Sequence, residues 1–548
     1  MNIALIQTNP IIGDFAGNAE KIIAQAHEAV RRGCRLTVFP ELALSGSPPR
    51  DLLERPGFIA DHERALDGLL AALPPDIFTL FGCFETNSGS GKSLFNSAVT
   101  AHGGAIVHRA RKRLLPTYDV FDESRYFEPG TLSPPLVIDG QNFAVTIDED
   151  ICFDENRRYA LDPLAELFTE AKRAGTRLSA CLHLAAWPFA RGQEAARRTM
   201  LARLARRFQT PFLCCNQVGG QDSLLFAGRS MAFDSQGMLC ALGESFAEDM
   251  IVIDTEKWQG EQRGPQSFSE DEEVLAALTM GLADYARKCG FKQALLGLSG
   301  GIDSALVAAV ACRALGPENV LAIAMPSAYN PAESLDDAEL LAKNLGCDFA
   351  VVPISPLAGA FAESLAPLFA GLPEGLAEQN VQARIRGNIL MAIANKFDRL
   401  LLNCGNKSEL AVGYCTLYGD MCGGLAVIAD CPKGLVYRLS ALFNREREII
   451  PRRIMTKAPS AELKPGQCDQ DDLPPYPVLD AILERYLEQG QSQTEIVAAG
   501  FDQAVVTDTL RRIRANEYKR QQAPPALRVT GKAFGPGRRY PICQNYRG

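Results

Sequence analysis

The chain has 548 residues, more than one hydrophobic core usually supports, so we expect at least two domains. Its net charge of −9 argues against a nucleic-acid partner, because phosphate backbones are bound by basic surfaces. No apolar run reaches about 18 residues, so we expect no transmembrane helix and no membrane partner. The 16 cysteines are scattered without a C-x-x-C pair, and no charged leader follows Met1, which favours reduced thiols and a cytoplasmic protein.

Short apolar segments alternate with amphipathic helices over residues 1–255. Strands are expected at "NIALIQ" and "RLTVFPE", on either side of a helix over 19–32, and again at "DIFTLFGCF", "SAVTAHGGAIVHRARK", "NFAVTID" and "PFLCCNQV". This order predicts a layered α/β domain of sheets and helices. The polar, glycine-containing residues 256–270 then break the pattern and have the composition of a linker.

The remaining residues, 271–548, begin with a long helix pattern and continue into a βαβ order. The strand "QALLGL" leads through a glycine-rich turn into the helix "DSALVAAVACRALG", and the strand "NVLAIAMP" follows. Such a crossover predicts a parallel sheet, with ligands near the carboxyl ends of its strands.

The turn of this βαβ unit, "LSGGIDSA", has the composition of a phosphate-binding loop. Gly300 and Gly301 permit close approach of a ligand to the backbone, and the free N–H groups of the following helix attract anions. No lysine follows Gly301, so the loop is not the G-x-x-x-x-G-K-[ST] type. Asp303 fits this position if magnesium bridges it to a nucleotide, whereas a plain structural turn is the alternative.

The loop resembles the S-G-G-x-D-S loop of the ATP pyrophosphatase group, whose members adenylate a substrate. The later segments "EQNVQARIRGNILMAIANK", "NCGNKSELAVGYCTLYGDMCGG" and "APSAELKPGQCDQDDLPPY" closely resemble NAD+ synthetases. The resemblance extends to the long form, in which a nitrilase-like domain precedes the synthetase. It implies an N-terminal αββα sandwich, a C-terminal parallel-sheet domain of the adenine-nucleotide α-hydrolase-like type, and a homo-oligomer.

The resemblance also implies roles for individual residues of the C-terminal domain. Asp303 and Glu409 would hold magnesium, and Lys433 would contact the ATP phosphates or the leaving group. For Lys407 and Arg386 an ordinary surface salt bridge is nearly as good an interpretation as contact with a phosphate. The other implied ligands of ATP are Ser299, Gly300, Gly301, Ile302, Asp303, Ser304 and Lys407, and those of the dinucleotide are Asn380, Arg384, Asp420 and Lys519.

The reaction implied by the resemblance is the ATP-dependent amidation of nicotinic acid adenine dinucleotide to NAD+. The substrate carboxylate attacks the α-phosphate of ATP to give an acyl adenylate and pyrophosphate, and ammonia then displaces AMP. The protein positions charges and needs no imidazole for this. All five histidines lie between His27 and His183, outside the synthetase half.

The N-terminal half resembles the nitrilase superfamily, in which a glutamate, a lysine and a cysteine cleave amides. Glu41 in "TVFPE" and Lys112 in "RKRLLPTYDVFDESRYF" match the glutamate and the lysine. The family's I-C-E-D tetrapeptide appears as Ile147-Asp148-Glu149-Asp150, so aspartate replaces the cysteine. Strand alternation makes Asp148 point where the thiol would, whereas Cys152 lies past the end of the strand.

Two further residues differ from the family pattern around the same pocket. Ser47 stands where a tyrosine lines the glutamine site, and Trp187 stands where a small serine is expected. We therefore predict that Asp148 pairs with Lys112, that the domain does not hydrolyse glutamine, and that the chain uses free ammonia. The alternatives are glutamine hydrolysis through Cys152, and a domain that only binds glutamine or a partner protein.

Overall fold

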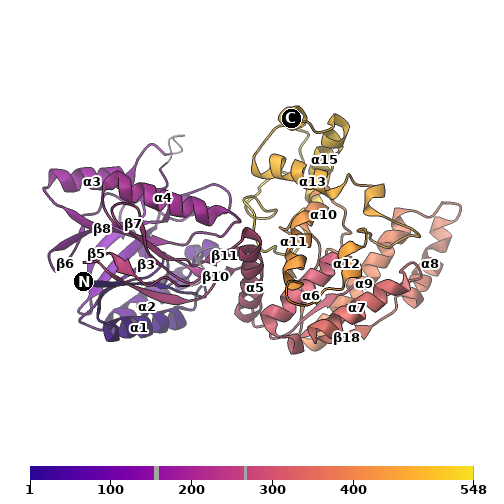
Figure 1. Cartoon of the computed structure of the whole chain (residues 1–548), viewed down its shortest axis with the longest axis horizontal. Coiled ribbons are helices and arrows are strands. Elements are labelled where there is room, and N and C mark those ends of the chain that lie inside the picture. The colour runs from indigo at the N-terminus through magenta and orange to yellow at the C-terminus, as the bar shows by residue number, and fades with distance from the viewer. Residues whose placement is uncertain (154–158, 264–267, 547–548) are drawn as a thin grey trace. The chain divides into compact units, whose positions relative to one another are not determined.

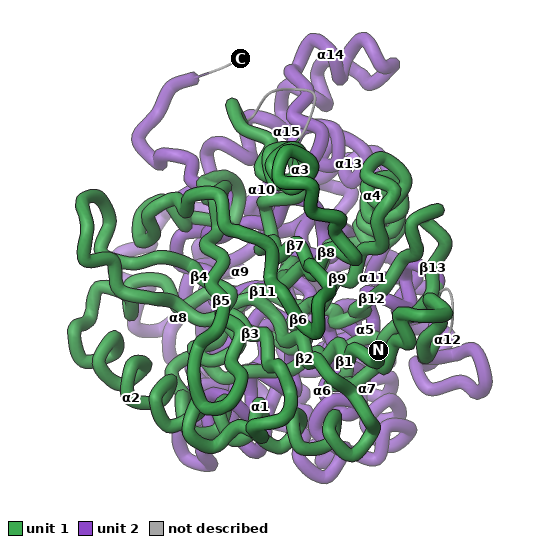
Figure 2. The backbone as a smooth tube through the Cα atoms, turned by 90° about the vertical axis from the view of Figure 1, so that its left-hand side faces the viewer, with its two compact units in different colours: residues 1–268 green, residues 269–548 purple. Residues whose placement is uncertain are grey.

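The computed structural model describes residues 1–153, 159–263 and 268–546. The chain divides into two compact units, Met1–Phe268 and Ser269–Gly548 (Figure 2). The linker expected at 256–270 falls partly on residues 264–267, which lie outside the described residues. Two of its residues, Gln259 and Gly260, pair with a strand and so belong to a sheet of the first unit.

Two sheets form the centre of unit 1. The first has the strand order β15-β14-β1-β2-β3-β4-β5 and the second β13-β12-β9-β8-β7-β6, with β10 and β11 as a separate hairpin. The strands of the first sheet are β1 (Asn2–Gln7), β2 (Cys34–Val38), β3 (Phe78–Thr86), β4 (Leu94–His102), β5 (Ala105–Arg111), β14 (Asp249–Asp254) and β15 (Gln259–Gly260). The others are β6 (Leu136–Ile138), β7 (Gln141–Ile147), β8 (Leu178–Ala185), β9 (Phe212–Asn216), β10 (Val218–Gln221), β11 (Leu224–Ala227), β12 (Met231–Phe233) and β13 (Leu239–Leu242).

Helices cover the outer face of each sheet, which gives four layers (Figure 1). The helices are α1 (Phe15–Arg31), α2 (Pro56–Ala72), α3 (Pro163–Arg173) and α4 (Gln193–Phe208). Ile22 of α1 and Leu69 of α2 pack against the first sheet, and Leu164 of α3 packs against the second. Apolar side chains of both sheets, Leu5 and Phe143 among them, fill the space between them. The predicted αββα sandwich is therefore confirmed.

Unit 2 contains a five-stranded sheet with the order β18-β17-β16-β19-β20, and every neighbouring pair in it is parallel. The strands are β16 (Ala294–Gly297), β17 (Val320–Ala324), β18 (Asp348–Val351), β19 (Leu400–Asn403) and β20 (Leu425–Ala426). β17 pairs with one edge of β16, and the chain later returns to pair with the other edge of β16 as β19. Ligands of open α/β sheets bind where the strand order reverses in this way. The predicted parallel sheet is confirmed.

Helices surround this sheet (Figure 1). They are α5 (Glu270–Lys288), α6 (Ile302–Leu315), α7 (Ala332–Leu345), α8 (Ser355–Phe369), α9 (Leu376–Phe397), α10 (Lys407–Val412), α11 (Lys433–Phe443), α12 (Arg452–Thr456), α13 (Tyr476–Leu483), α14 (Gln493–Ala498), α15 (Gln503–Ala515) and α16 (Glu517–Arg520). Helices α10, α13 and α15 share an apolar cluster that includes Leu410, Leu479 and Leu510. Among the described residues, no helix combines the length and the apolar character needed to cross a membrane.

Candidate functional site

The glycine-rich loop connects β16 to α6 and leaves the start of that helix open. Gly300 has φ +77°, and a Cβ there would lie 2.3 Å from the main-chain oxygen of Ser334, so only glycine fits. The hydroxyls of Ser299 and Ser304 lie 3.1 Å apart, and no described side chain caps α6. The first N–H groups of the helix are thus available to an anion, as the sequence predicts.

A cavity of about 350 Å³ opens beside this loop at the carboxyl ends of the central strands. This size suits a nucleotide-sized ligand. Of the residues expected to bind ATP, metal or dinucleotide, the cavity is lined by Ser299, Gly301, Ile302, Asp303, Ser304, Glu409, Asp420 and Lys433. The structure therefore brings together residues that are more than 100 positions apart in the chain.

Lys433, the first residue of α11, is buried between two carboxylates of the cavity wall. Its Nζ lies 2.5 Å from Asp303 Oδ2 and 3.3 Å from Glu409 Oε1. Burial raises the pKa of Glu409 to about 8, while the charge of Lys433 acts against the shift. Asn406 caps α10 and donates a hydrogen bond of 2.9 Å to Asp303. Both carboxylates thus face the same ammonium group. Carboxylate oxygens are also the ligands that magnesium prefers.

Five of the expected ligands do not line the cavity. Lys407 is buried in unit 2, where its Nζ contacts Asp430 at 3.2 Å, Glu488 at 3.0 Å and the Thr530 hydroxyl at 2.6 Å. Lys407 thus forms a salt bridge, but a buried one and not the surface salt bridge expected as the alternative. Gly300 is another of the five, but its left-handed backbone shapes the glycine-rich loop beside the cavity.

The other three, Asn380, Arg384 and Lys519, contact the segment that leads to Asp420. Asn380 accepts a hydrogen bond of 2.8 Å from the Thr416 hydroxyl, and Arg384 donates to the Leu417 carbonyl at 3.3 Å. Lys519 donates to the carbonyls of Gly413 and Cys415, both at 2.8 Å. They position the loop that carries Asp420, whose pKa burial raises to about 6.

The sequence reasoning missed several charged residues of the cavity. Asp469 is 4% exposed and accepts a hydrogen bond of 2.8 Å from the Tyr476 hydroxyl. Lys457 donates to the Ser334 hydroxyl at 2.6 Å and forms an ion pair with Glu462. Glu462 and Asp469 lie in the segment "APSAELKPGQCDQDDLPPY", and Lys457 directly precedes it. The charged residues of this segment were the available sign that it contributes to the cavity.

In unit 1, Lys112 lies at the end of β5 with three carboxylates around it. Its Nζ contacts Glu41 at 2.9 Å, Glu123 at 2.7 Å and Asp148 at 2.6 Å, and the lysine is 0% exposed. The expected pairing of Asp148 with Lys112 is thus present, whereas Glu123 was missed. Burial raises the pKa of Glu41 to about 7, opposed by Lys112, and raises that of Glu123 as well.

Asp148 lies immediately after β7, and its backbone adopts a left-handed conformation. Its φ of +41° is unusual for a non-glycine residue, and such conformations gather at functional sites. Asn96 donates a hydrogen bond of 2.7 Å to Glu41, which fixes the carboxylate opposite. The structure thus brings Glu41, Lys112 and Asp148, the three residues expected from the sequence, into one buried cluster.

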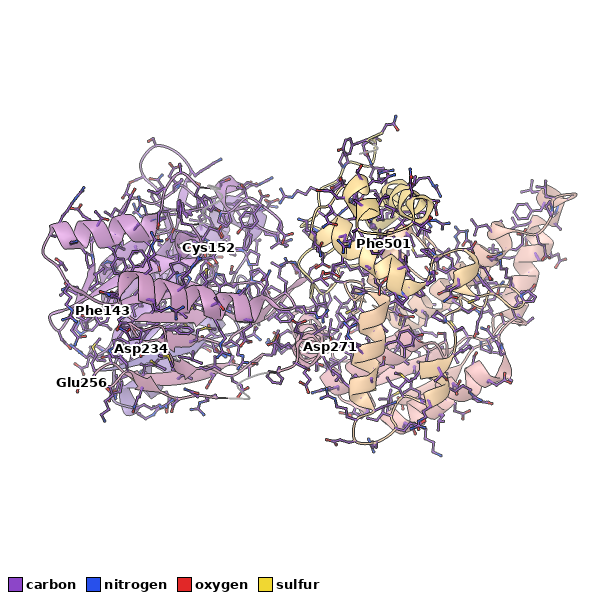
Figure 3. All side chains as sticks on the ribbon, turned by 45° about the horizontal axis from the view of Figure 1, so that its top comes forward. Phe143, Cys152, Asp234, Glu256, Asp271 and Phe501 are labelled. Atoms are coloured by element: carbon purple, nitrogen blue, oxygen red, sulfur yellow. The ribbon has the colours of Figure 1, made fainter. Side chains whose placement is uncertain are left out.

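Cys152 is half-buried, and its Sγ lies 4.0 Å from the main-chain oxygen of Asp148. In Figure 3, Phe143, near the start of β7, and Cys152, beyond its end, lie well apart. Burial raises the pKa of the Cys152 thiol well above its ordinary value, which disfavours the reactive thiolate. The thiol packs against the apolar cluster that contains Trp187, which is 6% exposed.

Comparisons with known proteins identify the families of both units. Residues 274–523 match the family model described as NAD synthase, and residues 2–258 match that of carbon-nitrogen hydrolases. The chain is 48% identical to a glutamine-dependent NAD(+) synthetase of Synechocystis over 99% of both chains, and 40% identical to one of Thermotoga maritima over 100% of this chain and 99% of that protein. The structure of a glutamine-dependent NAD+ synthetase of Acinetobacter baumannii in complex with ADP matches with a TM-score of 0.78 and 36% identity, over 99% of this chain and 98% of that one. The chain therefore belongs to the family of two-domain NAD+ synthetases, in which a carbon-nitrogen hydrolase domain precedes the NAD synthase domain.

Proposed function

We propose that this NAD+ synthetase amidates nicotinic acid adenine dinucleotide with free ammonia, and that its N-terminal unit does not hydrolyse glutamine. The observation that carries this proposal is Asp148, which stands at the nucleophile position and contacts Lys112 at 2.6 Å. An amidase of this kind needs a thiol that a glutamate can deprotonate. A carboxylate has no such proton, and its attack on an amide would produce a mixed anhydride from a weak nucleophile.

The synthetase chemistry is assigned to unit 2. The loop of Ser299 to Ser304 and the start of α6 hold the ATP phosphates, and Asp303 and Glu409 would hold magnesium. Magnesium, when bound, adds positive charge to the phosphate oxygens. The ammonium of Lys433 faces the same position and neutralises the pyrophosphate as it leaves, because it is buried and needs no reorganisation.

Ammonia enters this reaction as the second nucleophile. The substrate carboxylate first attacks the α-phosphate, and the resulting acyl adenylate then reacts with neutral ammonia to release AMP. Residues that fix the Asp420 loop, namely Arg384 and Lys519, orient the dinucleotide end of the cavity through that loop. Orientation of the acyl carbon toward the incoming ammonia is the main contribution of the protein to this step.

Glutamine hydrolysis is a second candidate, because the relatives named above are described as glutamine-dependent. That function would have to use Cys152, the thiol nearest in sequence to the replaced nucleophile. Iodoacetamide labelling of Cys152 with a parallel loss of glutamine-dependent activity would support it. The buried environment of that thiol and the indole of Trp187 argue against it.

A comparison of nitrogen donors tests the proposal. NAD+ formation is measured with saturating ATP and magnesium, once with ammonium chloride and once with glutamine freed of ammonium. We expect synthesis with ammonium and none above background with glutamine. Comparable rates with both donors would contradict the proposal, and loss of only the glutamine rate in Asp148→Ala would assign the hydrolysis to this site.

We also propose that the chain forms a homo-oligomer through α8. None of the residues of this helix is buried, although Leu357, Phe361 and Leu368 are large and apolar. Figure 1 shows α8 at the outer edge of unit 2. Exposed apolar faces of this kind mark protein contacts. Light scattering should give a mass above that of one chain, and Phe361→Glu with Leu368→Glu should lower it; a monomeric parent protein would contradict the proposal.

A further inference from the structure

Lys112 and Asp148 form a buried ion pair. The lysine is 0% and the aspartate 2% exposed, and Nζ lies 2.6 Å from Oδ2. Within the part of the chain that the structure describes, Lys112 is the one donor to the Asp148 carboxylate. The aspartate therefore lacks the additional hydrogen bonds that usually stabilise a buried ionised carboxylate.

The cluster also contains more acids than bases. Glu41 and Glu123 both contact the same Nζ, so three carboxyl groups share one ammonium. Burial disfavours a net negative charge, so protons are retained on part of these groups. The buried Oε2 of Glu123 has no partner among the described residues, which leaves it available to accept or give a proton.

The main chain holds the two reacting groups in place. The amide N–H of Lys112 donates to the Asn96 carbonyl at 2.8 Å. The Asp150 carboxylate accepts hydrogen bonds from the main-chain N–H groups of Arg113 and Leu114, at 2.9 and 3.0 Å, and so joins the segments of Lys112 and Asp148. Groups held at contact distance react with effective concentrations far above those in solution.

We propose that Lys112 and Asp148 become joined by an intramolecular amide bond, so that the former nucleophile position is closed covalently. Glu41 takes one proton from the Lys112 ammonium and passes it to the Asp148 carboxylate, and the neutral Nζ then attacks Cγ. The N–Cγ bond forms, Glu123 carries a second proton from Nζ to the same departing oxygen, and the Cγ–O bond breaks. The products are an amide and one water molecule, and no oxidant or other reactant is consumed.

Two other buried lysines of the chain provide internal comparisons. Asp430, beside Lys407, accepts hydrogen bonds from the N–H groups of Val529 and Thr530 at 2.8 and 2.7 Å, which stabilise its ionised form. Asp303, beside Lys433, lines the open cavity and is reached by water. Neither pair combines a poorly solvated aspartate with two flanking glutamates, so neither is expected to condense.

The mass of the full-length protein, measured after denaturation, tests the proposal. We expect a mass lower than that of the sequence by one water molecule, and a proteolytic map in which the peptide of Lys112 is joined to that of Asp148. A full sequence mass would overturn the proposal. A loss of water that maps elsewhere, such as a cyclised aspartate at Asp139–Gly140, would overturn it equally.

Variants test the chemistry of the step. Asp148→Asn should condense with release of ammonia, so its mass should fall by one ammonia instead of one water. Combined Glu41→Gln and Glu123→Gln should restore the full sequence mass although Lys112 and Asp148 remain. The matched control, Glu488→Gln beside Lys407, should keep the water loss. Since the parent protein alone decides whether the bond exists, variants that fail to fold leave the main result intact.

Discussion

The substitution Lys407→Met distinguishes a structural lysine from an ATP ligand. Its ammonium is 1% exposed and contacts Asp430, Glu488 and the Thr530 hydroxyl. Methionine keeps the volume of the side chain but leaves the fully buried Asp430 without its cation. Removing one partner of a buried ion pair costs about 3–5 kcal/mol. The N–H groups that still bind Asp430 place the expected loss at the lower end, about 3 kcal/mol.

Thermal unfolding of the parent and the variant measures this loss. A change of about 3 kcal/mol lowers the midpoint of a unit of this size by roughly 6–12 °C. The KM for ATP, measured well below the new midpoint, should stay within twofold of the parent value, because the lysine does not line the cavity. An unchanged unfolding midpoint together with a large rise in KM for ATP would contradict the structural role and show that Lys407 binds ATP.

Three further outcomes follow from the same structure. Lys433→Met should lower kcat for NAD+ synthesis by about 100- to 1,000-fold, since it removes a preorganised charge from the cavity; a fall below tenfold in steady-state kinetics would contradict that role. Burial raises the pKa of Glu41 to about 7, so the folded state keeps a proton that the unfolded state loses. The contribution of Glu41 to the stability of unit 1 should therefore be lost as pH rises from about 4.5 to about 7, and urea titrations should show a steeper fall in the parent than in Glu41→Gln, which keeps the contribution of Glu123. Asp148→Cys combined with Trp187→Ser should release ammonia from glutamine, whereas Asp148→Cys alone should not, because the indole still fills the pocket; activity of the single variant in a glutaminase assay would show that Trp187 leaves room for glutamine.

Much of the fold and part of the site could be predicted from the sequence, because both depend on local patterns. The apolar strand before "LSGGIDSA" and the helix after it are adjacent in the chain, so the anion-binding loop between them is a local feature. The position of Asp148 immediately after a strand was equally predictable, because it lies inside a tetrapeptide that ends an alternating apolar segment.

Contacts between distant segments could not be predicted in the same way. The partners of Lys407 are 81 and 123 residues away, at Glu488 and Thr530, and nothing near the lysine in the sequence indicates them. Glu123 and Asp469 lie in segments already recognised as similar to the family. Their roles depend on side-chain directions in irregular segments, which periodicity does not provide.

Isotope competition tests directly whether the nitrogen of NAD+ comes from free ammonia. The enzyme is given glutamine labelled with ¹⁵N in its amide together with an equal concentration of unlabelled ammonium, and the NAD+ formed is examined by mass spectrometry. If the amidase site is inactive, the carboxamide of the NAD+ formed should be unlabelled from the first turnovers onward. A ¹⁵N carboxamide that appears without ¹⁵N-ammonium in the medium would show that unit 1 hydrolyses glutamine and delivers its nitrogen to the synthetase.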